Sequence, residues 1–339
     1  MKKTKIILIC VVAAAVVAAA ALFIAWRYAT ATFGGDESVR VNIPAGTDAA
    51  GVRELLRERL GDSYGGKVAV LWDRQGGTAA KAHGSYVVEP GTEAIRLART
   101  IMAGRQTPVK LTYNNLRTFD QLAARVDAVL ELDSASFVAA CDSILAPAGF
   151  APEEYTAAFL PDTYEFYWTA DASDVVSKLL ATRTRFWNDE RRAKAAELGL
   201  TPVQVATIAS IVEEETNKAD ERPKVARLYM NRLAKGMALQ ADPTVKFAIG
   251  DFSIRRLTGK HLAVQSPYNT YKVNGLPPGP IRMPEAATLD AVLNAPEHNY
   301  IYMCAKSDFS GYHDFAENYD RHRINSARYH RALDRKGIK

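Results

Sequence analysis

Residues 203–242 read VQVATIASIVEEETNKADERPKVARLYMNRLAKGMALQAD, and this stretch organises the interpretation of the whole chain. Residues 203–212 are apolar enough to form a buried helix, and three glutamates, Glu213, Glu214 and Glu215, follow them directly. Carboxylates beside an apolar helix face are partly removed from water, which raises the pKa of a carboxyl group. A carboxylic acid that stays protonated near neutral pH is what general acid catalysis requires. An acidic helix end that only solvates the surface is the alternative.

Helical geometry separates the three glutamates only in part. At about 100° per residue, the apolar face is centred on a line through Val205 and Val212. Glu214 then points away from this face into solvent, whereas Glu213 and Glu215 lie on its two flanks, about 80° from the centre. Periodicity therefore predicts that the acid is Glu213 or Glu215 and does not choose between them.

The segment after the glutamates predicts a polar break, a second helix and a loop. Pro223 suits the first turn of that helix. Asp242 followed by Pro243 is typical of a turn. Gln240, Asp242 and Thr244 have side chains of the kind that hydrogen-bond sugar hydroxyl and acetamido groups, although such residues are also ordinary in loops.

A second polar stretch lies at residues 266–280, SPYNTYKVNGLPPGP. Its prolines and glycines predict a rigid loop, which holds side chains in place at little entropic cost on binding. The candidate ligand-binding residues of this loop are Tyr268, Asn269, Thr270 and Tyr271. His313 is a further candidate, although a single histidine is more often structural.

Three stretches carry a resemblance to a known family. They are FLPDTYEF at 159–166, ASIVEEETNKADERPKVARLYMNRLAKGMALQADPTVKFAIG at 209–250 and SPYNTYKVNGLPPGPIRMP at 266–284. In sequence and order, from about Phe159 to the C-terminus, the chain resembles the endolytic murein transglycosylases, the YceG-like or MltG proteins. The resemblance implies that the catalytic glutamate lies in the IVExET segment. The Glu–Thr pair of this segment resembles the Glu–Ser pair of other lytic transglycosylases. The resemblance therefore indicates Glu215 as the catalytic glutamate, with Glu213 as the alternative.

The resemblance also implies a reaction. It implies cleavage of the β-1,4 bond between N-acetylmuramic acid and N-acetylglucosamine in nascent glycan strands, without water and with a 1,6-anhydro-N-acetylmuramic acid end as product. One carboxyl suffices, because the group that protonates the leaving oxygen then accepts the proton of the attacking C6 hydroxyl. No cofactor is expected, Gln240, Asp242 and Thr244 are interpreted as lining the cleft, and peptidoglycan synthases are expected partners. A hydrolytic muramidase and a non-catalytic wall-binding scaffold are the alternatives.

The N-terminus predicts a membrane anchor. Residues 1–5 read MKKTK. Residues 6–26 carry no charge, and this uncharged run is long enough to cross a bilayer as a helix. The apolar core of a signal peptide is usually shorter, although cleavage remains the alternative. The positive-inside rule places residues 1–5 in the cytoplasm and the rest of the chain outside the inner membrane.

The length of 339 residues predicts two or three compact units of α+β class. After the transmembrane helix, the expected parts are a linker at 27–38, a LysM-like α+β domain at 39–104, an α+β connecting region at 105–158 and a mixed α/β catalytic domain at 159–339, with the acid-bearing helix at its centre. The LysM-like region, which the resemblance implies, either binds glycan or serves as a spacer. Within these parts, residues 68–72 are a strand candidate, and residues 174–197 are predicted to form one helix capped by Ser173.

Composition excludes several other functions. The net charge is +5, and no Lys/Arg-rich run has interleaved aromatic residues, which argues against nucleic-acid binding. Three cysteines without a CxxC pair, and six histidines without HExxH spacing, argue against a metal site. Cys141 and Cys304 are expected to be buried free thiols, with a disulfide between them as the alternative.

Overall fold

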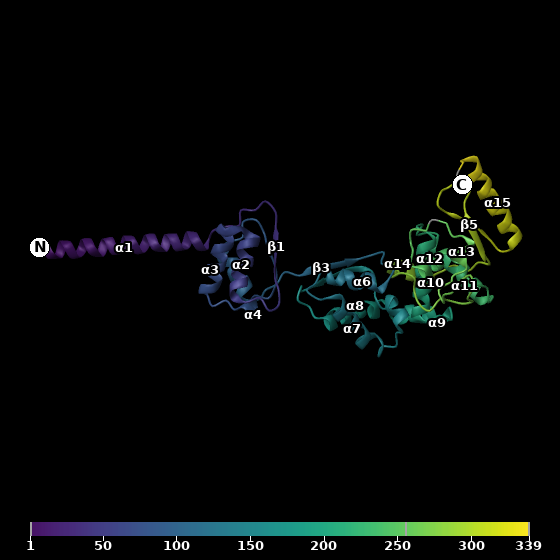
Figure 1. Cartoon of the computed structure of the whole chain (residues 1–339), viewed down its shortest axis with the longest axis horizontal. Helices are drawn as coiled ribbons and strands as arrows, with labels where there is room; N and C mark the ends of the chain where they lie inside the picture. Colours follow the sequence, from purple (N-terminus) through teal and green to yellow (C-terminus); the bar gives the residue numbers. More distant parts are fainter. Residues whose placement is uncertain (1, 255, 338–339) are drawn as a thin grey trace. The chain divides into compact units, whose positions relative to one another are not determined.

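The structure, a computed structural model, describes residues 2–254 and 256–337 and combines helices with short strands, as the α+β prediction requires (Figure 1). The chain divides into two compact units. The first contains Met1–Lys110, Val129–Glu131 and Glu165–Ala170, and the second contains Leu111–Ala128, Leu132–Tyr164 and Asp171–Lys339.

The chain begins with a long apolar helix, α1 (Lys2–Ala29). Its segment Lys3–Ala29 has a mean hydropathy of 3.1 and is not buried in the protein. Among the described residues, α1 is the only single helix that is long and apolar enough to cross a membrane. The helices α9 (Asp189–Glu197) and α10 (Pro202–Glu215) pass the same test only as one span bent by 78°, and α10 is buried in the second unit.

A two-stranded antiparallel sheet forms the base of the first unit. β1 (Val39–Ile43) pairs with β2 (Gly84–Val88), with Val39 opposite Val88. The helical segments that pack with this sheet are α2 (Ala49–Leu60), the π-helical turn η1 (Gly61–Gly65), α3 (Gly66–Arg74), α4 (Ala79–Ala82) and α5 (Ala94–Met102). Their buried side chains form one apolar core.

The strand predicted at residues 68–72 is wrong, because these residues lie in α3. Val68, Ala69 and Trp72 are all buried, which is the spacing of one helix face. A short apolar run is compatible with the period of a strand and with that of a helix. Here the packing of the buried side chains in the core of the first unit favours the helix.

The second unit is mainly helical and contains two small sheets. The first sheet pairs β3 (Val109–Tyr113) with β4 (Asp162–Phe166), and the second pairs β5 (Tyr302–Ala305) with β6 (His313–Ala316). The helical segments besides α9 and α10 are α6 (Phe119–Asp127), α7 (Ser134–Leu145), the 3₁₀ segment η2 (Pro152–Ala158), α8 (Ala172–Phe186), α11 (Arg222–Ala234), α12 (Asp242–Ile249), α13 (Gly259–Leu262), α14 (Ala286–Leu293) and α15 (Tyr319–Arg335).

Helix α10 is at the centre of the second unit, in contact with η2, α9, α11, α12 and α14. Its start is fixed by a capping box between Thr201 and Gln204, with Pro202 in the first turn. Residues 205–213 are all buried, so the apolar half of the helix is surrounded by protein on every side. The helix ends at Glu215, and Thr216 continues in an extended conformation.

Two boundaries differ from those predicted around α10. The helix predicted over residues 174–197 is two helices, and the first is capped by Asp171 instead of Ser173. Asn188 begins the second by accepting a hydrogen bond from the Arg191 amide at 2.9 Å. The turn predicted at residues 242–243 is the first turn of α12, where a proline is well tolerated.

The proline-rich loop packs tightly against the backbone of η2. A Cβ atom added at Gly279 would overlap the carbonyl group of Glu153. We expect Gly279→Ala to lower the free energy of unfolding by about 1–3 kcal/mol, because the backbone has to move to make room. Gly259→Ala is the matched control, since nothing lies within 4 Å of the added atom. Equal urea midpoints for the two variants would contradict this close contact.

Candidate active site

A pocket of about 380 Å³ lies at the C-terminal end of α10, within the second unit. Its walls come from α10, α11, the start of α12, the β5–β6 sheet and α15. The lining residues are Glu215, Leu228, Tyr229, Arg232, Leu239, Gln240, Asp242, Tyr271, Tyr302, Met303, Cys304, Ala305, His313, Tyr319 and His322. The structure thus brings together five of the residues selected from sequence: Glu215, Gln240, Asp242, Tyr271 and His313.

Glu215, the last residue of α10, is half-buried in the wall of this pocket. The hydroxyl group of Tyr229 donates a hydrogen bond to its Oε1 at 2.7 Å. Burial raises the pKa of Glu215, and the charge of Asp242 raises it further. The Tyr229 hydrogen bond and the charges of His313 and Lys246 act in the opposite direction without cancelling the effect of burial. Glu215 therefore retains its proton to a higher pH than an ordinary glutamate.

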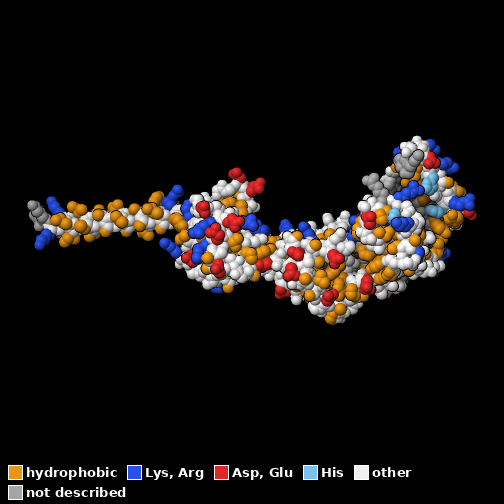
Figure 2. All heavy atoms as spheres, in the orientation of Figure 1, with side chains coloured by type: hydrophobic (Ala, Val, Ile, Leu, Met, Phe, Trp, Pro, Cys, Tyr) orange, Lys and Arg blue, Asp and Glu red, His pale blue; other side chains and the backbone are white. Residues whose placement is uncertain are grey.

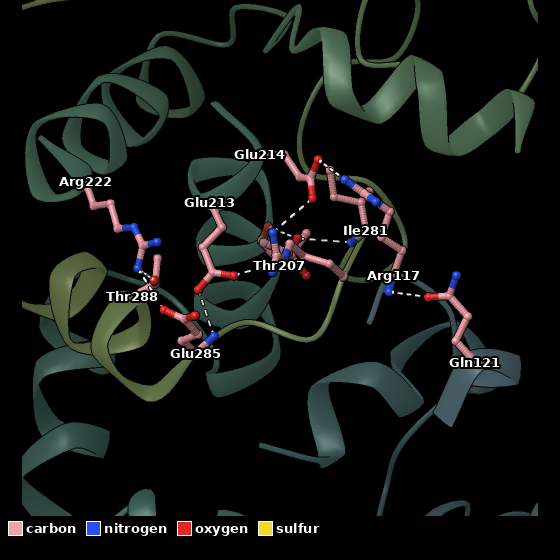
Figure 3. A network of polar contacts seen from close by, with 11 residues as sticks. Arg117, Gln121, Thr207, Glu213, Glu214, Arg222, Ile281, Glu285 and Thr288 are labelled. Atoms are coloured by element: carbon pink, nitrogen blue, oxygen red, sulfur yellow. Dashed lines mark hydrogen bonds and ion pairs between the residues drawn. The ribbon is translucent and has the colours of Figure 1, made fainter. Parts of the chain in front are cut away.

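Glu213 lies on another side of α10 and does not line the pocket. It is 4% exposed, and its carboxylate forms an ion pair with Arg282 Nε at 2.9 Å. The backbone amide of Glu285, just before α14, donates a hydrogen bond to Glu213 Oε1 at 2.7 Å (Figure 3). The pKa of Glu213 is also raised by burial, but its contacts tie α10 to the neighbouring segment. Of the two candidate acids, only Glu215 reaches the pocket.

The expectation that Glu214 points into solvent is wrong. Its side chain is 17% exposed and forms ion pairs with Arg117 and Arg282, each at 3.0 Å (Figure 3). The arginines come from the segment before α6 and from the segment before α14. The periodicity of α10 places Glu214 away from the apolar face correctly, but it carries no information about these two segments.

A buried carboxylate fixes the histidine of the pocket. Glu221 has a side chain that is 4% exposed and accepts hydrogen bonds from His313 Nδ1 at 2.8 Å and from the His313 amide at 2.8 Å. Thr216, the residue after Glu215, donates a third hydrogen bond to Glu221 at 3.0 Å. With Nδ1 donating to Glu221, Nε2 of His313 is the ring nitrogen left for the pocket. The end of α10 and the start of β6 are thus joined through one carboxylate.

Gln240 and Asp242 are also held by specific partners. Arg232 Nη2 donates a hydrogen bond to Gln240 Oε1 at 2.7 Å, and Gln240 itself adopts a left-handed backbone conformation with φ of 52°. Such a conformation costs free energy for a residue with a side chain and often occurs at functional sites. Tyr271 donates a hydrogen bond to Asp242 Oδ1 at 2.5 Å. The polar atoms of the pocket are therefore preorganised.

Comparison with known proteins identifies the family. A model of the YceG-like family matches residues 41–328. The chain belongs to the YceG-like family. An endolytic murein transglycosylase of Bacillus subtilis is 35% identical over 148 residues, which cover 44% of this chain and 41% of the relative. One of Streptococcus pneumoniae is 27% identical over 173 residues, which cover 50% of this chain and 31% of the relative.

The matches thus span less than half the length of these two curated relatives. The fold is also similar to the 2.6 Å crystal structure of a yceG-like protein of Listeria monocytogenes. The sequence identity is 27% and the TM-score is 0.57, and the match covers 86% of this chain and 99% of the other.

The remaining sequence-selected residues of this YceG-like chain do not line the pocket. Thr244, Asn269 and Thr270 are fully buried behind its wall. Thr270 Oγ1 contacts Thr244 Oγ1 at 2.8 Å and accepts a hydrogen bond from the Ala241 amide at 3.0 Å, while Asn269 Oδ1 accepts one from the Tyr271 amide at 3.1 Å. Tyr268 packs on Phe247, with 4.7 Å between ring centroids. These contacts hold the wall that carries Gln240, Asp242 and Tyr271.

Several pocket residues were not predicted from sequence. The contact of the Tyr229 hydroxyl group with Glu215 has no signal in the sequence, where Tyr229 is an ordinary residue of the helix α11. Nothing in the sequence pattern places Tyr302, Tyr319 or His322 near α10. Cys304 is only partly buried, contrary to the prediction, and it lines the pocket as a free thiol. Cys141 is buried and also free.

No group of three or more His, Cys, Asp or Glu residues in the described part of this YceG-like chain is arranged to hold a metal ion.

The raised pKa of Glu215 has a consequence for stability. The ordinary pKa is 4.5 and the folded-state pKa is higher, so the folded protein binds this proton more tightly and loses stability as pH rises between the two values. We expect Glu215→Gln to melt at a higher temperature than the wild type at neutral pH, with the difference disappearing below about pH 4.5.

The matched control is Glu214→Gln, which removes ion pairs to two arginines and is expected to melt below the wild type at neutral pH. Thermal unfolding followed by circular dichroism between pH 4 and pH 8 provides the measurement. A Glu215→Gln variant that is less stable than the wild type at neutral pH would contradict the raised pKa.

Proposed function

We propose that the protein is a membrane-anchored lytic transglycosylase that cleaves the bond between N-acetylmuramic acid and N-acetylglucosamine within nascent peptidoglycan strands. The observation that carries this proposal is a single glutamate with a raised pKa in the wall of a polar pocket, Glu215. The relatives named endolytic murein transglycosylases support the substrate class.

Glu215 is proposed to act first as an acid and then as a base. Its protonated carboxyl donates to the glycosidic oxygen as the bond from C1 breaks. The resulting carboxylate accepts the proton of the C6 hydroxyl of the same muramic acid, whose oxygen attacks C1 and closes the 1,6-anhydro ring. The proton count is unchanged and no water is consumed. Tyr229 occupies Oε1 of Glu215, which leaves Oε2 for both transfers.

The other polar groups of the pocket are proposed to hold the sugar. Gln240, fixed by Arg232, offers amide donors to hydroxyl and acetamido oxygens. His313 offers Nε2, because Glu221 holds Nδ1. Thr244, Asn269, Thr270 and Tyr268 contribute indirectly, since they support the wall.

Replacing the acid tests the assignment. Glu215→Gln should lower the turnover of isolated sacculi by roughly 10²–10⁴-fold, because it removes the proton donor. Glu213→Gln is the matched control on the same helix, with activity expressed per folded molecule because the change leaves Arg282 without its buried partner. Release of 1,6-anhydromuropeptides, measured by mass spectrometry, is the readout. Activity that survives Glu215→Gln and disappears in Glu213→Gln would reverse the assignment.

A second candidate reaction is hydrolysis, and Asp242 is the observation that favours it. Hydrolytic glycosidases use two carboxyl groups, and Asp242 shares the pocket with Glu215. The two reactions differ in product mass by one water, about 18 Da, because only hydrolysis adds water across the bond. We favour the lytic reaction on the names of the relatives, and the role of Asp242 can be tested directly.

Asp242→Asn distinguishes the two reactions by pH profile and product. Because the charge of Asp242 raises the pKa of Glu215, its removal should lower that pKa and move the alkaline limb of the pH–rate profile to lower pH. In the lytic reaction the variant still releases anhydro products. Loss of all activity together with hydrated wild-type products would instead establish Asp242 as the base that activates water.

Helix α1 supports a location at a membrane. We propose that α1 spans the inner membrane once, with the N-terminal lysines in the cytoplasm and the chain after α1 outside the membrane. Peptidoglycan synthases are the proposed partners in ending strand elongation.

For the first unit we propose LysM-like glycan binding. In the sequence its antiparallel strands β1 and β2 flank the segments α2, η1, α3 and α4, and a pocket of about 360 Å³ lies beside β2 and α5. A spacer role for this unit predicts that it does not bind glycan, whereas a scaffold role for the whole chain predicts wall binding without any product.

A further inference from the structure

Strand β5 contributes four consecutive residues to the wall of the pocket: Tyr302, Met303, Cys304 and Ala305. Successive side chains of a strand point to opposite faces, so a pocket on one face meets only every second residue. A pocket that meets all four residues therefore reaches the edge of the strand, where the backbone is accessible. Their exposure agrees, because all four residues are half-buried and do not alternate along the strand.

The register of the β5–β6 pair shows which backbone groups lie on this edge. In an antiparallel pair every second residue exchanges hydrogen bonds with its partner, and the residues between direct their N–H and C=O groups away. Lys306, directly after β5, donates its amide to the carbonyl oxygen of Tyr312 at 2.9 Å. By this alternation, Ala305 and Met303 direct their backbone groups away from β6.

Two further contacts support this direction. His313, which lies opposite Ala305, donates its amide to Glu221 at 2.8 Å and not to β5. Directly before β5, the carbonyl oxygen of Ile301 accepts a hydrogen bond from Arg232 Nη1 at 3.0 Å. Because Arg232 itself lines the pocket, the edge of β5 that is turned away from β6 faces the pocket.

This edge is available to a ligand. Within residues 2–254 and 256–337, β5 pairs with β6 alone, and no other group of the chain forms a hydrogen bond with the backbone of Met303 or Ala305. The wall lies at the surface of the second unit, where pale-blue histidine atoms are visible around β5 and α15 (Figure 2). A strand edge with free N–H and C=O groups is a template for a ligand that carries an amide.

We propose that the free edge of β5 binds an acetamido group of the glycan strand, with the Ala305 amide donating a hydrogen bond to its carbonyl oxygen. N-acetylmuramic acid and N-acetylglucosamine both carry this group. Ala305 has the smallest side chain of the four β5 residues, which lets a sugar approach its backbone closely. It also lies opposite His313, whose Nε2 is left for the pocket.

A stem peptide is the other part of the strand that carries amides. A peptide that adds to a sheet edge gains affinity from several consecutive main-chain hydrogen bonds. Strand β5 offers only two residues with outward-facing backbone groups, Met303 and Ala305, which favours a single acetamido group over a peptide. The inference rests on the proposed function and names the feature of the sugar that the pocket selects.

The test removes the proposed donor. Proline has no N–H and is tolerated on an edge strand where the N–H faces away from the ladder, so Ala305→Pro deletes one donor from the free edge. Ala305→Val is the matched control, because valine adds similar bulk and keeps the amide. Both changes are made in the full chain together with Glu215→Gln, which suppresses cleavage.

Each variant is titrated with end-labelled glycan strands freed of stem peptides, either N-acetylated or chemically de-N-acetylated, and fluorescence anisotropy gives Kd. We expect Ala305→Pro to bind N-acetylated strands about tenfold more weakly than Ala305→Val, as for the loss of one hydrogen bond. On de-N-acetylated strands the two variants should agree within about twofold. The amino groups of these strands meet both variants equally, so their charge cancels in the comparison. An equal loss on both kinds of strand, or no loss on either, would overturn the inference.

Hydrogen exchange gives a second measurement that needs no change in β5. In the full chain with Glu215→Gln alone, the Ala305 amide should exchange rapidly, because it has no partner in the ladder. N-acetylated strands should slow its exchange by about tenfold, and de-N-acetylated strands should not. Slowing that occurs only with stem-bearing strands would overturn the inference and assign the edge to the peptide.

Binding is measured without turnover, so this inference and the catalytic proposal fail separately. If the wild type released no anhydro products, a loss in Ala305→Pro confined to N-acetylated strands would still support the inference. If the wild type released anhydro products and binding did not depend on the Ala305 amide, the catalytic proposal would stand and the inference would fail.

Discussion

The hydrogen bond from Tyr229 to Glu215, made where a buried helix emerges into a polar pocket, is the interaction on which the site depends. Removal of the carboxyl from water raises its pKa, while the neighbouring hydroxyl holds one oxygen in place. Both effects require α10 to be enclosed by protein up to its last turn. The capping box at Thr201, the packing of η2, α11 and α14 and the extended Thr216 all serve that arrangement.

Three consecutive glutamates end in three different environments because each faces a different neighbour. Glu213 is fully enclosed and paired with Arg282, Glu214 bridges two arginines, and Glu215 meets a tyrosine in an open pocket. Removing one partner of a buried ion pair leaves a charge without compensation, which makes Arg282 important for the fold. A group whose pKa is raised by burial makes folding less favourable at neutral pH, so the ionised Glu215 lowers the stability of the fold.

Much of this arrangement could be predicted from the sequence, and the failures have physical causes. The apolar run before Glu213 predicted the helix α10 correctly, because local periodicity decides such an element. The break at Asn188 was missed because a single capping residue inside a helical pattern is a weak signal. The environment of Glu214 depends on arginines 68 and 97 residues away in the chain, which periodicity does not detect.

The same limit applies to the pocket. Asn269 and Thr270 were selected for their polarity, yet their polar atoms satisfy buried backbone groups, since a tight loop needs such partners. Residues of α15 were missed because only the folded chain brings Tyr319 and His322 into the same pocket as Glu215. Sequence alone therefore selected Glu215 and part of the wall of its pocket, while the residues contributed by β5 and α15 required the structure.

The most direct measurement of the central claim is the titration of Glu215 itself. Carbon-13 NMR of the side-chain carboxyl groups of glutamate-labelled protein, compared with the Glu215→Gln variant, isolates the one signal that the substitution removes. The account predicts that this signal titrates clearly above the ordinary glutamate pKa of 4.5. Titration at or below that value would contradict it, because the pocket would then hold a carboxylate with no proton to donate at neutral pH.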